Sequence, residues 1–141
     1  MQNLPIAFSW TDPYGLIAAR AKVFLYFVRV TDASGDAYCY IGKTKNGKSR
    51  LREYRRNIEK IFAGRPRRVT LGQEKYRAVH LALAKACELG WNYEFYPLEE
   101  VELSRLNVVE QQRISELSCN LNSGCSWSVG NYQTLTIRDL L

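Results

Sequence analysis

The sequence contains no long apolar run and few of the residues that build disulfides or zinc sites. No stretch of about 18 apolar residues occurs, so we expect no membrane-spanning helix. The cysteines Cys39, Cys87, Cys119 and Cys125 form no C-x-x-C pair, and His80 is the single histidine. Structural zinc needs closely spaced Cys and His ligands, which this pattern does not offer. Free thiols and a cytoplasmic location are therefore expected.

Length and composition indicate one ordinary globular domain. The 141 residues, 46% of them hydrophobic, are enough to bury a core without disulfides. Residues 1–13 lack the basic start and apolar stretch of a signal peptide. We expect an N-terminal extension over residues 1–21, the main domain over 22–125, and a tail over 126–141 that packs on it.

Positive charge is concentrated in one segment. The formal net charge is +6, and residues 43–68 alone hold eleven lysines and arginines against two glutamates. The rest of the chain is therefore mildly acidic. A basic helix is often just a solvated face, but a concentration this local favours phosphate binding and a nucleic-acid partner.

The first half of the chain predicts a β-hairpin followed by a helix. Residues 23–30 are apolar on both faces, which predicts a strand in the middle of a sheet. Turn-forming residues fill positions 31–36, and residues 37–41 predict the returning strand. Residues 50–62 predict a helix, because apolar side chains recur there at helical spacing. These side chains are Leu51, Tyr54, Ile58 and Ile61.

The second half predicts two further helices around one strand. Thr70 and Gln73 have the spacing of a capping box, so we expect a helix from Thr70 to Gly90, which tolerates a left-handed cap. Residues 91–98 predict a third strand. A last helix is expected over residues 104–117, capped by its first serine.

The order of these elements, β-β-α-α-β-α, contains no repeated βαβ unit. It predicts an α+β fold with a small three-stranded antiparallel sheet flanked by helices, and argues against a Rossmann-type sheet. The tail is expected either to add a strand around residues 133–137 or to pack on the surface.

The run from Tyr40 to Leu51 is the most informative segment. Tyr40 and a glycine turn at Gly42 precede Lys43 and then Arg50 at the start of a helix. Tyr26 stands fourteen residues before Tyr40, in the first strand. Such groups lose a proton, bind phosphate and offset negative charge, which points to chemistry on a phosphodiester. For two tyrosines alone, ordinary strand packing is an equally good interpretation.

Glu110 is an anomaly in the last helix, because it falls on the apolar stripe. A buried carboxylate is costly unless a cation or hydrogen bonds compensate it. A structural ion pair, or a helix rotated outward, would explain it without a function. A functional interpretation is a ligand for a hard cation such as Mg²⁺. The stripe comprises Leu103, Leu106, Ile114 and Leu117.

Over roughly residues 22–123 the chain resembles the GIY-YIG endonucleases. Phe24-Leu25-Tyr26 stands at the first name-giving tripeptide, which has lost its glycine, and Tyr40-Ile41-Gly42 matches the second. The family's arginine follows eight residues after that glycine, as Arg50 does. Glu110 and Asn122 fit the family's glutamate and asparagine, with Asn120 as an alternative for the latter. The hairpin loop is longer than usual, and the likeness is greatest to the small phage-encoded endonuclease II group.

The resemblance implies a hydrolase that cuts double-stranded DNA with one divalent metal, Mg²⁺ or Mn²⁺, held by Glu110. Tyr26 would be the general base, provided that nearby cations lower its pKa. Arg50 would bind the scissile phosphate, Tyr40 would position water or phosphate, and Lys43 would bind phosphate. Asn122 would hold neighbouring groups by hydrogen bonding. A phage or mobile-element origin and a restriction-like role are implied by the resemblance alone.

Further basic residues are expected to grip the DNA backbone around this site. They are Lys45, Lys48, Arg52, Arg55, Arg56, Arg65, Arg67, Arg68 and Lys75. His80 is expected in the core, with a part in the site as the alternative, and the three tryptophans are expected in the core or at an interface. One site per chain would favour a homodimer or homotetramer for double-strand cutting. Two rival functions stay open: a non-catalytic DNA-binding protein on a nuclease fold, and a structural or regulatory protein that faces an acidic partner.

Overall fold

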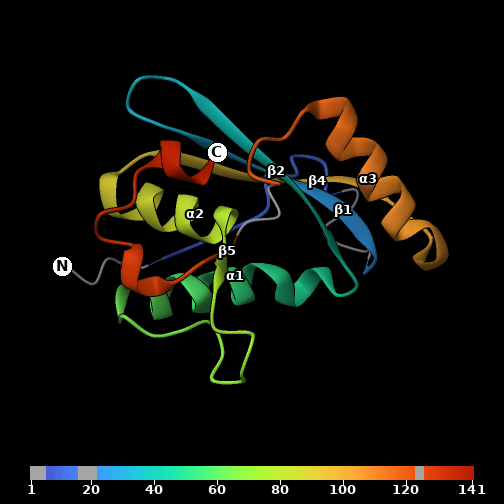
Figure 1. The fold of residues 1–141 in the computed structure, drawn as a ribbon. Coiled ribbons are helices and arrows are strands. Elements are labelled where there is room, and N and C mark those ends of the chain that lie inside the picture. Colours follow the sequence, from blue (N-terminus) through green and yellow to red (C-terminus); the bar gives the residue numbers. More distant parts are fainter. Residues whose placement is uncertain (1–5, 16–21, 123–125) are drawn as a thin grey trace.

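The computed structural model of the chain describes residues 6–15, 22–122 and 126–141. Within them, an antiparallel sheet of three strands and three α-helices form an α+β fold, as the sequence predicted (Figure 1). The elements are β1 (Phe24–Thr31), β2 (Ala37–Thr44), α1 (Gly47–Phe62), β3 (Tyr76–Arg77), α2 (Ala78–Leu89), β4 (Asn92–Glu100), α3 (Leu106–Leu117) and β5 (Ser126–Trp127). Short 3₁₀ helices lie at Leu103–Arg105, Val129–Asn131 and Ile137–Leu140. No helix of this described part is long and apolar enough to cross a membrane.

Strand β1 is central in the sheet, whose order is β2-β1-β4. Both neighbours run antiparallel to it. Side chains such as Tyr26 and Val28 join the main core, whereas Leu25 packs with Leu106 and Val109 of α3 on the other face. Because β1 is covered on both faces along its first half, the run from Phe24 to Val28 is continuously apolar, whereas Arg29 near its end is exposed. Figure 1 shows α3 across the sheet from α1 and α2.

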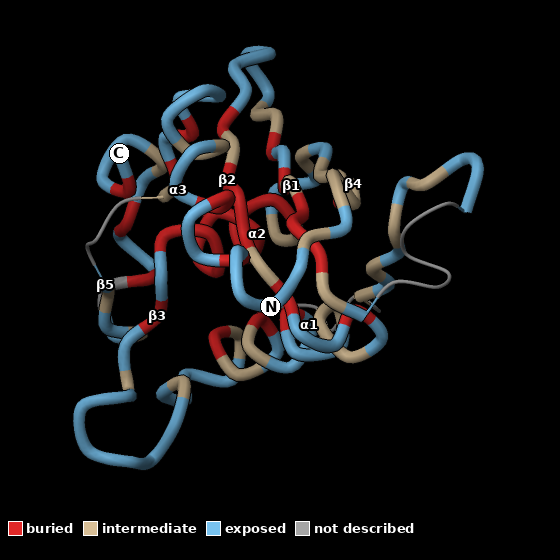
Figure 2. The backbone as a smooth tube through the Cα atoms, turned by 90° about the vertical axis from the view of Figure 1, so that its right-hand side faces the viewer, coloured by how far each residue is buried: buried red, intermediate tan, exposed pale blue. Residues whose placement is uncertain are grey.

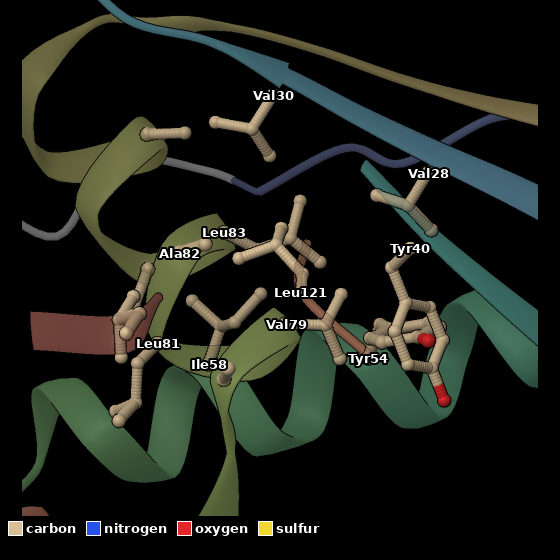
Figure 3. Close-up of a cluster of buried hydrophobic side chains, with 14 of the residues drawn as sticks. Val28, Val30, Tyr40, Tyr54, Ile58, Val79, Leu81, Ala82, Leu83 and Leu121 are labelled. Atoms are coloured by element: carbon tan, nitrogen blue, oxygen red, sulfur yellow. The ribbon is translucent and has the colours of Figure 1, made fainter. Parts of the chain in front are cut away.

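The main core lies between the sheet and the pair α1 and α2. Figure 3 shows how side chains from these elements interlock with Leu121, which follows α3. In α1, Tyr54, Ile58 and Ile61 are buried, as the helical spacing predicted. The cysteines Cys39, Cys87 and Cys119 are free thiols, and Cys125 lies outside the described residues.

The helix expected from Thr70 begins later, at Ala78. The Thr70 backbone carbonyl accepts a hydrogen bond from the Gln73 amide at 3.0 Å, and Gly72 has a φ of +86°. That left-handed conformation closes a turn and stops a helix from forming there. The capping-box prediction was therefore wrong, whereas Gly90 does end α2 with a left-handed cap at φ 74°.

Helix α3 buries a narrower stripe than the sequence predicted. Leu106, Val109 and Glu110 are buried, but Leu103 and Leu117 are exposed. The expected serine cap falls within the 3₁₀ turn Leu103–Arg105 that precedes the helix. Only the first turns of α3 pack on the sheet, which leaves the end of the predicted stripe in solvent.

The tail contributes to the core. Strand β5 pairs with β3, and Tyr132, Leu135 and Leu140 are buried in the main cluster. No strand forms at residues 133–137, because a turn there leads into the 3₁₀ helix Ile137–Leu140. In the N-terminal segment, Trp10 bridges Phe95 of β4 and packs on the same core.

Candidate active site

An open cleft of about 1650 Å³ collects side chains from both halves of the chain. Its walls come from the β1–β2 hairpin, α1, the segment before β3, α2 and α3. All six residues predicted for the chemistry line it, although they lie far apart in sequence. They are Tyr26, Tyr40, Lys43, Arg50, Glu110 and Asn122.

Gly42 is required by a close approach of Tyr26. The two residues are cross-strand partners in β1 and β2. A Cβ atom on Gly42 would lie 2.2 Å from Cζ and 2.4 Å from the hydroxyl oxygen of Tyr26. Gly42 sits within a strand and makes no turn, so the predicted glycine turn was wrong. The glycine instead lets the tyrosine ring lie flat across β2.

Tyr26 is almost fully enclosed. It is 2% exposed, and its hydroxyl forms a 2.7 Å hydrogen bond with the hydroxyl of Tyr54. Burial raises the pKa of Tyr26 well above its usual value, and Tyr40 adds to this effect while Arg50 opposes it. The expectation that neighbouring cations lower this pKa was therefore wrong, because desolvation outweighs them.

Tyr40 has a cationic partner that the sequence did not reveal. Arg77 Nη1 donates to its hydroxyl oxygen at 3.3 Å. The pKa of Arg77 is raised, chiefly by Tyr40 and despite burial. Arg77 lies in β3, 37 residues after Tyr40 in the sequence. Only the fold shows this pairing, because Arg77 fell inside the helix expected from Thr70.

Glu110 projects from α3 toward β2. Its Oε1 lies 3.4 Å from Lys43 Nζ, which also donates to Oδ1 of Asn107. The Glu110 side chain is 12% exposed and that of Lys43 is 40% exposed. The predicted anomaly is real, and its compensating cation is Lys43. This ion pair satisfies the structural interpretation while leaving the carboxylate at the cleft.

Arg50 is held at two of the three nitrogens of its guanidinium. Its Nη2 donates to the Lys43 carbonyl at 3.2 Å, and its Nη1 lies 3.0 Å from a carboxylate oxygen of Glu53. Its Nε is buried and has no hydrogen-bond partner among the described residues. A buried donor without an acceptor is rare in folded proteins. An anion bound in the cleft would have a positively charged, prepositioned side chain beside it.

Asn122 clamps the outer edge of β2. Its Oδ1 accepts from the Ile41 amide and its Nδ2 donates to the Ile41 carbonyl, both at 2.8 Å. Asn120 makes one such bond, its Oδ1 accepting from the Cys39 amide at 3.0 Å. Both side chains thus replace a missing neighbouring strand. Asn122 therefore fixes the strand that carries Tyr40 and Gly42.

The cleft lining as a whole is strongly basic, with nine lysines and arginines against three glutamates. Five of the predicted DNA contacts line it, namely Lys45, Arg56, Arg67, Arg68 and Lys75, whereas Lys48, Arg52, Arg55 and Arg65 do not. The pKa of Arg67 is lowered, first by burial and then by Arg77 and Arg68. Cations that destabilise one another this way favour an anionic ligand.

His80 lies beneath this surface, as expected of a core histidine. It is 6% exposed, and its Nδ1 accepts from the Arg77 amide at 3.3 Å. Its ring packs against those of Tyr54 and Tyr76. Burial, with help from Arg67, Arg77 and Arg50, lowers its pKa from 6.5 to about 3. His80 is therefore neutral at pH 7.

Of the three glutamates that line the cleft, Glu110 is the most buried and is the candidate ligand for a hard cation. No group of three or more His, Cys, Asp or Glu side chains gathers anywhere in the part of the chain that is described. A closed protein cage for a metal is thus not present there. Mg²⁺ is often held by one or two carboxylates with waters and phosphate oxygens. Glu110, partly buried and facing the cleft, fits that kind of site.

Comparisons with known proteins add no relative: no family model, no curated protein and no solved structure matches the chain.

Proposed function

We propose that this protein is a DNA endonuclease of the GIY-YIG type that hydrolyses phosphodiester bonds. The observation that carries the proposal is the convergence of Tyr40, Arg50, Lys43 and Glu110 in one basic cleft. A tyrosine, a guanidinium and a carboxylate beside many unpaired cations suit a phosphate substrate. Charged side chains of this kind are not needed to form a hydrophobic core.

The general base is a tyrosine, and the local electrostatics favour Tyr40 over Tyr26. Arg77 donates to the Tyr40 hydroxyl, so it would stabilise negative charge on that oxygen. The pKa of Tyr26 is raised, and its hydroxyl is hydrogen-bonded to the hydroxyl of Tyr54. In the proposed step, Tyr40 as the phenolate takes a proton from water while the water oxygen attacks phosphorus. The bond from phosphorus to the 3′ oxygen breaks, and that oxygen leaves with the bonding electron pair and takes a proton from solvent water to become the 3′ hydroxyl.

Arg50 and Lys43 would hold the scissile phosphate. The Nε of Arg50 lacks a partner, and its two other nitrogens are anchored, which preorganises the guanidinium. Preorganised charge is the main source of stabilisation for a developing anionic transition state. Asn122 acts through the backbone of Ile41 and keeps β2 in place, so it is a positioning residue.

Glu110 would hold the divalent cation, Mg²⁺ or Mn²⁺. Such a cation, when bound, neutralises charge on the phosphate and on the leaving oxygen. Lys43 lies 3.4 Å from the Glu110 carboxylate, so it orients that carboxylate before DNA arrives. Cutting both strands with one such cleft per chain would favour a dimer or tetramer on the duplex.

Plasmid cleavage tests the proposal. Purified protein is incubated with supercoiled plasmid in Mg²⁺, in Mn²⁺ and in chelator, and nicked and linear products are measured over time. We expect cleavage that depends on the cation and carries 3′-hydroxyl ends. Mapping these ends on a long duplex then gives the strand polarity and any site preference.

A non-catalytic DNA-binding protein is the second candidate, and the Lys43–Glu110 ion pair favours it, because the pair gives Glu110 a purely structural partner. This alternative predicts salt-sensitive DNA binding without any cleavage. A protein that neither binds nor cuts DNA would contradict both candidates and point to an acidic protein partner for the basic surface.

A further inference from the structure

Residues 65–75 form a loop, here called the projecting loop, that stands out from the body of the molecule. Figure 1 shows it below α1, leading into β3, and Figure 2 shows that it is largely exposed. Its base is fastened at several points. Tyr76 donates its hydroxyl to the Arg65 carbonyl at 2.8 Å, the Arg67 amide bonds the Glu74 carbonyl at 2.9 Å, and Lys60 Nζ bonds the Arg67 carbonyl at 3.0 Å. These hydrogen bonds fix the base of the projecting loop and therefore the direction in which the loop extends.

The tip of the projecting loop is apolar. Val69 is 94% exposed and Leu71 is 91% exposed, the two highest values among the large hydrophobic residues described as exposed. The turn from Thr70 to Gln73 holds the tip, with Gly72 in the left-handed region and its amide on Oε1 of Glu74. Two apolar side chains fixed at the end of a polar loop contribute nothing to the core. Their exposed position at the end of the loop suits insertion into a binding partner.

The sides of the same loop are basic and continue into the cleft. Arg67, Arg68 and Lys75 line the cleft, as do Gly72 and Gln73 next to the tip. Arg65 adds a further positive charge at the base. A second copy of this loop would meet it with the same charge, which disfavours self-association through the tip. Duplex DNA offers the complementary arrangement, with phosphates on the outside and apolar base faces between them.

We propose, on the basis of the nuclease function proposed above, that the projecting loop is a DNA wedge. Leu71 and Val69 enter the minor groove beside the cleft and partly unstack one base step. Arg67 and Arg68 hold the phosphates on either side. Apolar wedges of this kind kink a duplex by tens of degrees and let it wrap more protein surface. The kink would bring the phosphate next to the opened step toward Arg50.

Permanganate footprinting tests the wedge, because permanganate attacks unstacked thymines anywhere on a long duplex. The complex is formed with Glu110→Gln, so that the DNA stays uncut. The wedge variant adds Val69→Ser and Leu71→Ser. A matched control adds Leu89→Ser and Leu103→Ser, which are 55% and 59% exposed on other parts of the surface. Sedimentation velocity reports the oligomeric state of every variant.

We expect protein-dependent thymine reactivity with the parent and the control. The wedge variant should lose at least about fivefold of it at saturating protein, with the salt dependence of binding unchanged, because the phosphate contacts remain. Equal reactivity in wedge variant and parent, or none in a parent that binds DNA, would overturn the wedge while leaving the nuclease proposal intact. A wedge variant that dissociates into smaller species without losing reactivity would likewise overturn it, in favour of self-association. Absence of DNA binding by the parent would overturn both.

Discussion

The two walls of the cleft hold charge in different ways. On the α3-side wall, formed by β2 and α3, Glu110 faces Lys43 at 3.4 Å and Asn122 is fully engaged with Ile41. On the α1-side wall, formed by α1, the projecting loop and β3, the described structure gives Arg56, Arg67, Arg68 and Lys75 no carboxylate partner within 4 Å. Under the proposed function, the first arrangement would fix a few groups for chemistry. The second would attract the polyanionic DNA over a wide surface.

This contrast predicts that substitutions on the two walls affect different quantities. Changes of Glu110 or Asn122 on the α3-side wall should alter the cleavage rate or the fold with little effect on DNA affinity. Changes of Arg56, Arg67, Arg68 or Lys75 on the α1-side wall should alter affinity and its salt dependence while leaving the rate of the bound complex unchanged. Arg50 also lies on α1 but belongs to the groups proposed for the chemistry.

The largest expected effect comes from replacing Tyr40 by phenylalanine, and the same replacement at Tyr26 is the comparison. Tyr40→Phe should lower the single-turnover cleavage rate by about 10²–10⁴-fold, the usual contribution of a general base. Tyr26→Phe should cost much less rate and roughly 1 kcal/mol of stability, because it removes a buried hydrogen bond to Tyr54. Single-turnover kinetics and urea unfolding of both variants provide the check. A larger rate loss for Tyr26→Phe would restore Tyr26 as the base.

Gly42→Ala should destabilise the fold by about 3 kcal/mol, as expected of a severe overpacking change. The added Cβ would meet the ring of Tyr26 at 2.2 Å. Gly130→Ala is the matched control, since its nearest neighbour would be 3.7 Å away. Urea midpoints compare the two variants. Equal midpoints would show that the Tyr26 ring has room to move and that its close approach does not require glycine at position 42.

Arg67→Gln and Arg68→Gln should each weaken DNA binding by roughly tenfold and reduce the slope of log affinity against log salt by about one. The cleavage rate at saturating protein should stay the same. Arg29→Gln serves as the control, because Arg29 lies outside the cleft and pairs with Glu94 at 2.6 Å. An unchanged salt slope in the two cleft variants would remove the α1-side wall from the DNA interface.

The smallest effect concerns His80 and pH. Its pKa in the folded protein is lowered to about 3, whereas the unfolded chain takes up the proton near 6.5. The unfolded state therefore binds more protons between these values, and stability falls as pH is lowered from 6.5. From pH 6.5 to 5 the loss should be on the order of 1 kcal/mol. Urea unfolding of His80→Gln should show a flatter profile over this interval, and an equally steep profile would contradict the assignment.

The main strands and helices could be predicted because buried positions leave a regular pattern of apolar residues in the sequence. Strand β1 is covered on both faces, so its apolar run carried the signal of a central strand. Helix α1 showed its buried side at helical spacing, and Glu110 stood out because a carboxylate interrupted an apolar stripe. These features depend on residues near one another in sequence. They are also the features that brought the predicted site residues to the same cleft.

What the sequence did not predict depends on tertiary contacts. The Thr70–Gln73 spacing suits a helix start, but Gly72 turns the chain and delays α2 to Ala78. The pairings of Tyr26 with Tyr54 and of Tyr40 with Arg77 arise only when α1 and β3 pack against the sheet. The raised pKa of Tyr26 likewise depends on how completely these elements enclose it.

The central claim is that Glu110 belongs to chemistry and not to DNA binding. The direct measurement compares wild type with Glu110→Gln for both single-turnover cleavage and duplex affinity in Mg²⁺, with unfolding midpoints to verify the fold. The account predicts a loss of cleavage of about a thousandfold or more, with affinity within a factor of a few. Cleavage by Glu110→Gln at the wild-type rate would contradict it.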